Sequence, residues 1–420
     1  MQLEDAIIAI NEQENRRFAI GEMFKRMKQY DLIAQRIEGR RIWTSPSHSV
    51  IDFASCNYLG LDLDPDMRGS VEEAMERWGL HPSWCRLVAS PKIYQEAEEK
   101  LAELIGTETT LILPTVTLIS IGVIPALVGK SGLILLDKSG HETMYEGAKI
   151  ARDSGATLVS FKQGDFARLE ALLSNYRDNP RKVILIDGVY SMSGDFAELP
   201  ELVRLAKTYD ALLYIDDAHG FGVVGEGPRA AMPYGQRGNG IVRYHGLSYE
   251  NIIYVGGCSK AYSSLAAFVG CSRKMQSFIK AFSTPYDLSG PCPTASLATL
   301  IRGLSINEQR GECYRQRLFR LTHKAIVGLR ALGFTVLNRS WFPIVFVKIG
   351  NNEATIATAN QLFELGVLVT VSPFPMVVPG EEGHRLTFTA ANTEGEIDHL
   401  LWAFAQILGT LTETSTSNFI

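Results

Sequence analysis

The sequence predicts an α/β fold, in which a mostly parallel sheet is covered by helices, followed by a smaller α+β domain. Short runs of Val, Ile and Leu alternate with amphipathic helical segments through the middle of the chain. This alternation is typical of strands buried on both faces of a parallel sheet. The chain has 420 residues, more than one core usually holds, so we expect a second, smaller domain.

Six apolar runs are the expected strands of the large sheet. They lie at residues 131–137, 157–161, 182–189, 211–218, 251–258 and 266–271. Before them, residues 1–40 are charged and carry apolar residues at helical spacing, and residues 38–55 have the pattern of a turn and a strand. These patterns predict an N-terminal arm over residues 1–50 and a large domain over residues 51–300.

The C-terminal part has a different pattern. After the Pro- and Ser-containing segment 283–296, a long helical region is expected to about residue 332. Four further strands, with helices between them, are expected at 334–338, 343–350, 366–372 and 384–390. Alternating strands among helices are typical of an α+β domain, so we expect a small C-terminal domain over residues 301–420.

Composition and charge favour small-molecule partners. Apolar residues make up 46% of the chain and charged residues 21%, as in ordinary globular proteins. The net charge of -5 and the lack of a Lys/Arg block argue against a surface for nucleic acid. The six cysteines show no C-x-x-C spacing, so no metal site is indicated. The N-terminus lacks a signal-peptide pattern, and we expect a cytoplasmic protein.

One apolar stretch, residues 110–129, has the length of a membrane span. Pro114, Pro125, three threonines and Ser120 interrupt it. We therefore expect a buried strand, a loop and a helix there, without stable insertion into a membrane.

Polar side chains follow four of the expected strands at the point where each ends. They are Asp137 with His141, then Asp187, then Asp216 with Asp217, and finally Lys260. Ligands of a parallel sheet bind at these carboxyl ends. Singly, Asp216 could be a helix cap, His141 a surface histidine and Lys260 a solvated cation. Together they predict a Schiff-base site, because burial disfavours an ammonium and leaves a nucleophilic amine.

Five motifs in one order extend this prediction over most of the chain. They are CNYLGLD at 56, HETMYEG at 141, GVYSMSGD at 188, DDAHGFGVVGE at 216 and RLTFTAANTEGEID at 385, with the lysine of SKA, Lys260, before the last. This series resembles the α-oxoamine synthase family of pyridoxal 5'-phosphate (PLP) enzymes. The resemblance implies the fold-type I architecture of PLP-dependent transferases, with a large domain around a central sheet and a small C-terminal domain.

The resemblance also implies how the cofactor is bound. Lys260 carries PLP as a Schiff base, and Asp216 faces the pyridine nitrogen and keeps it protonated. His219 lies near the phenolic oxygen, His141 stacks on the pyridine ring, and Ser191 bonds near the cofactor oxygen. Catalysis is thereby assigned to Lys260, His141, Asp216 and His219.

For the substrate, the resemblance implies that Arg385 binds the α-carboxylate with its planar donor fork. Asn57 and Arg86 are expected close to the substrate, whereas Tyr58 is either near it or a core residue. The family's sites lie between two subunits, which implies a homodimer with shared active sites and the segment 282–290 near the partner's phosphate.

The sequence departs from the family pattern around the expected phosphate site. The usual Ser-Gly-aromatic loop is Thr115, Val116 and Thr117 here, and Gly257 stands where a threonine is usual. The phosphate is therefore expected on these hydroxyls, on Ser259 and on free N–H groups.

Other departures lie further from that site. The usual Gly-Ser-Arg is Trp84, Cys85 and Arg86, and Asp187 replaces a glutamate. More residues separate Asp216 from Lys260 in this sequence than is usual in the family. Residues 233–250 are the expected insertion. These departures favour a divergent substrate.

The leading hypothesis is an acyltransferase that condenses an amino acid with an acyl thioester and releases CO2 to give an α-aminoketone. Lys260 is the natural general base for the α-proton. The acyl carrier is either coenzyme A or an acyl-carrier protein. Two alternatives stay open: another fold-type I PLP activity, such as an aminotransferase, aldolase or lyase, and a non-catalytic partner subunit.

Overall fold

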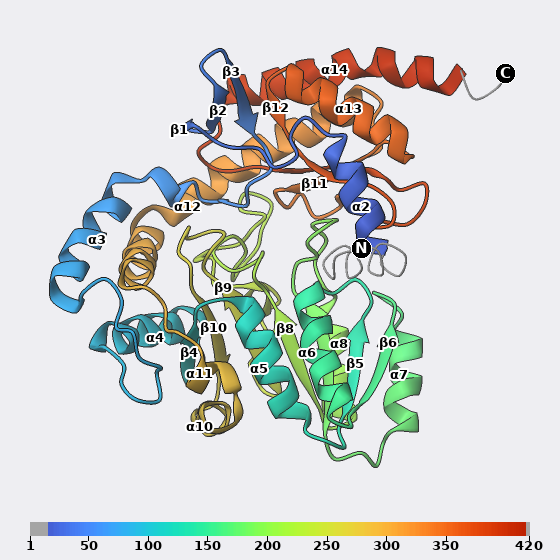
Figure 1. Ribbon diagram of the computed structural model, residues 1–420. Helices are drawn as coiled ribbons and strands as arrows, with labels where there is room; N and C mark the ends of the chain where they lie inside the picture. Colours follow the sequence, from blue (N-terminus) through green and yellow to red (C-terminus); the bar gives the residue numbers. More distant parts are fainter. Residues whose placement is uncertain (1–15, 417–420) are drawn as a thin grey trace, which may run out of the picture. The chain divides into compact units, whose positions relative to one another are not determined.

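The computed structural model describes residues 16–416, which form two compact units (Figure 1). One unit is Asn57–Arg317. The other combines the N-terminal part as far as Cys56 with the part from Leu318 onward. The long helix α12 (Thr294–Ala331) contributes to both units. The domain boundaries expected near residues 50 and 300 stay predictions.

A seven-stranded sheet forms the centre of the Asn57–Arg317 unit. In spatial order its strands are β4 (Thr109–Leu113), β10 (Ala267–Cys271), β9 (Ile252–Gly257), β8 (Ala211–Asp216), β7 (Lys182–Asp187), β5 (Leu133–Asp137) and β6 (Thr157–Phe161). β10 is antiparallel to both neighbours, and the pairs from β9 to β6 are parallel. The predicted α/β class with a mostly parallel sheet is confirmed, and each of the six expected runs contains one strand.

The apolar runs follow from burial on both faces of this sheet. Every residue of β5, β7 and β9 is buried, which is why these strands have few alternating polar positions. Helices α5 (Val116–Val128) and α6 (Glu142–Asp153) pack side by side (Figure 1) and share one apolar core with the strands. The remaining helices of this unit are η1 (Leu61–Leu63), α3 (Pro65–Trp78), α4 (Lys92–Ile105), α7 (Phe166–Asn175), α8 (Leu199–Thr208), α9 (Ile241–Tyr244), α10 (Arg273–Phe282) and α11 (Thr284–Leu288).

The apolar stretch 110–129 forms strand β4, a short loop and helix α5, as its interruptions predicted. The Thr115 side chain accepts the backbone N–H of Leu118 at 3.1 Å and so caps the helix. None of the described helices combines the length and apolarity that crossing a membrane requires.

The second unit holds two small sheets. One has the order β1 (Arg36–Glu38), β2 (Arg41–Ser45), β3 (His48–Asp52) and β12 (Val367–Leu368). The other has the order β11 (Ile344–Lys348), β14 (Gly383–Thr387) and β13 (Thr370–Ser372). Its described helices, besides the end of α12, are α2 (Arg16–Lys25), α13 (Asn352–Glu364) and α14 (Glu394–Thr416).

Two strand predictions for this unit need correction. Residues 334–338 form only an isolated bridge, from Val336 to Val347. The run 366–372 divides between the sheets, because Val367 pairs with Ile51 of the N-terminal hairpin whereas β13 pairs with β14. Pairing with a segment more than 300 residues earlier is not visible in local periodicity.

Candidate active site

A cavity of about 170 Å³ lies at the carboxyl ends of β7, β8 and β9. It is several times larger than the roughly 30 Å³ share of one water molecule, so it is large enough for part of a small ligand. The lining residues are Pro114, Thr115, Val116, Thr117, His141, Thr143, Asp187, Val189, Asp216, Ala218, His219, Ser259, Lys260, Leu265 and Ala266. The four residues predicted as catalytic and the residues predicted for the phosphate therefore share one cavity.

Lys260 and Asp216 provide the opposite charges of this cavity. Asp216 ends β8 with 5% of its surface exposed and accepts the backbone N–H of Ala218 at 3.1 Å. Burial raises the pKa of Asp216, and the positive charges of Lys260 and His141 oppose that rise. Lys260 is half-buried, more open than the sequence suggested, because it lies on the loop after β9 at the cavity itself.

His219 is buried and its ring is held by a tyrosine. The Tyr58 hydroxyl lies 2.6 Å from His219 Nδ1, and Tyr58 itself is fully buried. A partner at Nδ1 sets the tautomer and the orientation of an imidazole. Tyr58, which the sequence predicted either near the substrate or in the core, is thus a buried residue that supports the ring of His219.

His141 begins helix α6 as its N-cap. Its Nδ1 accepts the backbone N–H of Thr143 at 3.3 Å, and its own backbone N–H donates to Asp187 Oδ1 at 3.0 Å. The imidazole is exposed at the cavity. Capping and the Asp187 contact therefore hold the histidine at the mouth of the cavity, where a flat ligand ring could stack on it.

Comparison with known proteins gives three findings. The family model described as aminotransferase class I and II matches residues 48–404. An 8-amino-7-oxononanoate synthase from Thermoanaerobacter pseudethanolicus is 32% identical over 360 residues, which cover 85% of this chain and 87% of the relative. A solved serine palmitoyltransferase from S. paucimobilis, with a bound PLP–myriocin adduct, has a TM-score of 0.84 at 24% identity and covers 93% of this chain and 98% of its own.

The chain belongs to the aminotransferase class I and II family. Its similarity to 8-amino-7-oxononanoate synthases over 85% of its length shows that it is a PLP-dependent acyltransferase of the α-oxoamine synthase type. An 8-amino-7-oxononanoate synthase structure from Francisella tularensis has a TM-score of 0.70 at 20% identity, covering 88% of this chain and 99% of its own. At this identity the structural likeness supports the fold-type I architecture alone.

The polar groups of the cavity fit the family's cofactor. PLP needs an amine for its aldehyde, an acid for its ring nitrogen and donors for its phosphate, and Lys260, Asp216 and the start of α5 offer these groups. The first N–H groups of a helix have no partner within it and favour anions. Val116 and Thr117, the first two residues of α5, line the cavity, as does Ser259.

Gly257 explains one departure from the family pattern. A Cβ at this position would lie 2.9 Å from the Cβ of Ala218 and 3.4 Å from Val116 Cγ2. The end of β9 thus packs so closely on the aspartate loop that a threonine would require a shift. Any hydroxyl for the phosphate must come from the neighbouring segments instead.

Three predicted residues of the Asn57–Arg317 unit lie outside the set that lines the cavity. Ser191 is half-buried in the turn after β7, and Asn57 Oδ1 accepts the Ser263 hydroxyl at 3.2 Å, three residues beyond the lysine. Arg86 is buried in an ion pair with Glu98 at 2.6 Å and lies 3.9 Å above the Tyr94 ring. These contacts give Arg86 a structural task, and its contact with substrate stays a prediction.

Arg385 belongs to the other unit. It lies in the middle of β14, between Phe346 of β11 and Thr370 of β13, and its Nη2 donates to Cys56 Sγ at 3.5 Å. The three-stranded sheet therefore fixes the backbone of Arg385. The contact of the Arg385 side chain with a substrate carboxylate stays a prediction.

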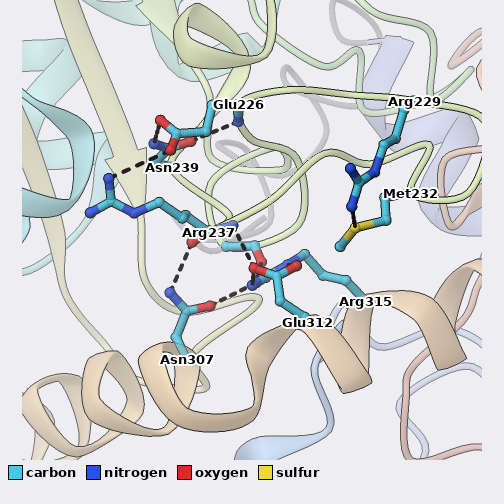
Figure 2. A network of polar contacts seen from close by, with 9 residues as sticks. Glu226, Arg229, Met232, Arg237, Asn239, Asn307, Glu312 and Arg315 are labelled. Atoms are coloured by element: carbon cyan, nitrogen blue, oxygen red, sulfur yellow. Dashed lines mark hydrogen bonds and ion pairs between the residues drawn. The ribbon is translucent and has the colours of Figure 1, made fainter.

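The predicted insertion, residues 233–250, is held in place by hydrogen bonds from side chains of helix α12, as Figure 2 shows. Glu312 accepts the backbone N–H of Arg237 at 2.7 Å, and Asn307 donates to the Arg237 carbonyl at 2.9 Å. Arg315, 2% exposed, donates to the Gly222 carbonyl at 3.0 Å. Gly222 follows the aspartate–histidine loop by three residues, so this network supports the backbone behind His219.

Asp217 faces away from the cavity into the protein. Its Oδ2 accepts the Ile241 N–H at 2.8 Å and the Tyr254 hydroxyl at 2.7 Å. Complete burial raises the pKa of Asp217 from 3.8 to about 7, although both hydrogen bonds oppose the rise. These contacts with the insertion and with β9 give Asp217 a structural role.

We expect Asp217 to make stability depend on pH. The pKa of Asp217 is higher in the folded than in the unfolded protein. Its protonated carboxyl therefore contributes fully to the free energy of unfolding below about pH 4, and this contribution is lost as pH rises through about 7. Asp217→Asn cannot ionise. From about pH 5 to pH 8 the unfolding free energy of the variant should therefore rise by about 3 kcal/mol relative to wild type. Urea titrations at both pH values test this, and a constant difference would contradict it.

Proposed function

We propose that this protein condenses an amino acid with an acyl thioester, with loss of CO2, to form an α-aminoketone. The observation that carries the proposal is the shared cavity of Lys260 and Asp216, in a chain 32% identical to an 8-amino-7-oxononanoate synthase over most of its length. PLP, when bound, supplies an electron sink that stabilises negative charge on the substrate α-carbon.

The residues of the chain have distinct tasks in this proposal. Lys260 Nζ removes the α-proton, because an amine at this place in the cavity would lie within reach of the substrate α-carbon once the substrate's own amine is bound there. The Asp216 carboxylate holds the proton on the ring nitrogen, and its burial strengthens that ion pair. His219, oriented by Tyr58, donates to the phenolic oxygen. Arg385 binds the substrate carboxylate.

Product analysis with the purified protein tests the proposal. Amino acids are combined one at a time with acyl-CoA or acyl-carrier-protein thioesters of several chain lengths, and free thiol and CO2 are measured. We expect thiol release only when both substrates are present, with an α-aminoketone detected by mass spectrometry. Conversion of a keto acid without thioester would instead identify an aminotransferase. Protein that binds PLP but converts no substrate would favour the non-catalytic subunit.

A homodimer in the cytoplasm is also proposed. Four apolar side chains on two adjacent segments are largely exposed: Leu80 73%, Leu87 62%, Val88 75% and Leu288 76%. The segments meet where His81 Nε2 lies 3.2 Å from the Pro291 carbonyl. Exposed apolar groups of this kind favour a protein interface and so support the dimer. All six cysteines are free thiols, which fits the reducing environment of the cytoplasm. Analytical ultracentrifugation tests the dimer, and a monomer at micromolar concentration would refute it.

A further inference from the structure

Asp187 lines the cavity without a role in the proposed reaction. It ends β7 directly opposite Asp216 of β8, with adjacent strands about 4.8 Å apart. Both side chains are buried, with 2% and 5% of their surfaces exposed. The two carboxyls are therefore neighbours on one edge of the sheet, and both line the same cavity.

The groups around Asp187 provide two positive charges, those of Lys260 and His141, against three carboxyls, those of Asp137, Asp187 and Asp216. They come from every element packed against it: Asp137, His141, Tyr190, Tyr214, Asp216 and Lys260. Asp137 already accepts the Tyr190 hydroxyl at 2.6 Å and the Ser139 N–H at 2.9 Å. Lys260 is the only lysine among these described neighbours. Adjacent buried carboxylates repel, and each uncompensated charge is costly.

The surroundings of the two aspartates differ in a way that decides which one keeps its charge. Burial and the charge of Asp216 raise the pKa of Asp187 well above its usual range. For Asp216, the largest effect after burial is the attraction of Lys260, which lowers the pKa. Asp216 therefore ionises first, and its charge then disfavours ionisation of Asp187.

We propose that Asp187 is a positioning residue whose carboxyl stays neutral, holding His141 in place and leaving Asp216 as the single carboxylate opposite the lysine. A neutral acid keeps one acceptor oxygen, and Oδ1 receives the His141 N–H at 3.0 Å. A second negative charge beside Asp216 is thereby avoided. The consequence for catalysis rests on the proposed function, whereas the protonation state does not.

Infrared difference spectra of the PLP-free full-length protein test the protonation state directly. Spectra are compared at about pH 8, where Asp217, with its pKa of about 7, is mostly ionised. We expect wild type minus Asp187→Asn to show the carbonyl stretch of a protonated carboxyl. Wild type minus Asp216→Asn should not show a band of that size. No band for Asp187, or a band that depends on Asp216 instead, would overturn the proposal.

Kinetics and cofactor binding then test the positioning of His141. Asp187→Ala removes the acceptor and should lower kcat about tenfold and weaken PLP binding by a similar factor. Asp187→Asn keeps an acceptor oxygen without charge and should bring both values to within about threefold of wild type. A loss beyond about 100-fold in the asparagine variant, or an altered pH profile, would show that the charged form is needed and would overturn the proposal.

Discussion

Replacing Lys260 with alanine is expected to lower kcat/KM by at least about 1,000-fold, because the variant loses both the covalent amine and the general base. Among the described residues that line the cavity, no other lysine is present to replace it. Thiol release measures the rate, and the visible absorbance band of the bound cofactor measures the loss of the covalent link.

Lys207→Ala is the matched control for this variant. Lys207 is exposed and pairs with Glu250 at 2.7 Å on the surface, so its removal should leave the rate within about twofold. If Lys260→Ala retained more than about a tenth of the wild-type rate, the lysine would not be the base or the covalent anchor.

Glu98→Ala is expected to lower the unfolding free energy by about 3–5 kcal/mol, because Arg86 would keep a buried charge without its partner. The side chains of Arg86 and Glu98 are 7% and 13% exposed and lie 2.6 Å apart. Glu98 also accepts the Ile112 N–H at 2.8 Å, so the substitution removes two contacts at the edge of the large sheet. Urea unfolding followed by circular dichroism measures the change.

The neighbouring position provides the control for this prediction. Glu99 is exposed and contacts Gln95 one helical turn away, so Glu99→Ala should change stability by no more than about 0.5 kcal/mol. The double variant Arg86→Met and Glu98→Gln should recover part of the loss, since no unpaired charge stays buried. Equal losses at positions 98 and 99 would rule out a buried ion pair as the cause.

Most of the large sheet and the centre of the site could be predicted from the sequence. The apolar runs of β5, β7, β8 and β9 reflect burial on both faces, which acts on each strand locally. The position of Lys260 after one such run, and of Asp216 after another, then places both at the same edge. Such inferences need only periodicity and the rule for strand ends.

The contacts that complete the site could not be read in this way. Tyr58 meets His219 across 161 positions, and Arg86 meets Glu98 within a buried pair although its motif suggested a substrate contact. Side-chain partners of this kind depend on how separate segments of the chain pack against one another, whether they are 12 or 161 positions apart, and local patterns do not encode that packing.

By itself, the sequence determined the α/β class, the positions of the main strands along the chain and the placing of Lys260 and Asp216 at one edge of the sheet, because strand burial and strand ends leave local patterns. Only the tertiary structure decided that Asp187 lies directly opposite Asp216 on the neighbouring strand and accepts the backbone N–H of His141. It also decided that Gly257 packs too closely on Ala218 for a larger residue. Register between strands and close packing arise from contacts across the folded chain, and so they appear only once the chain has folded.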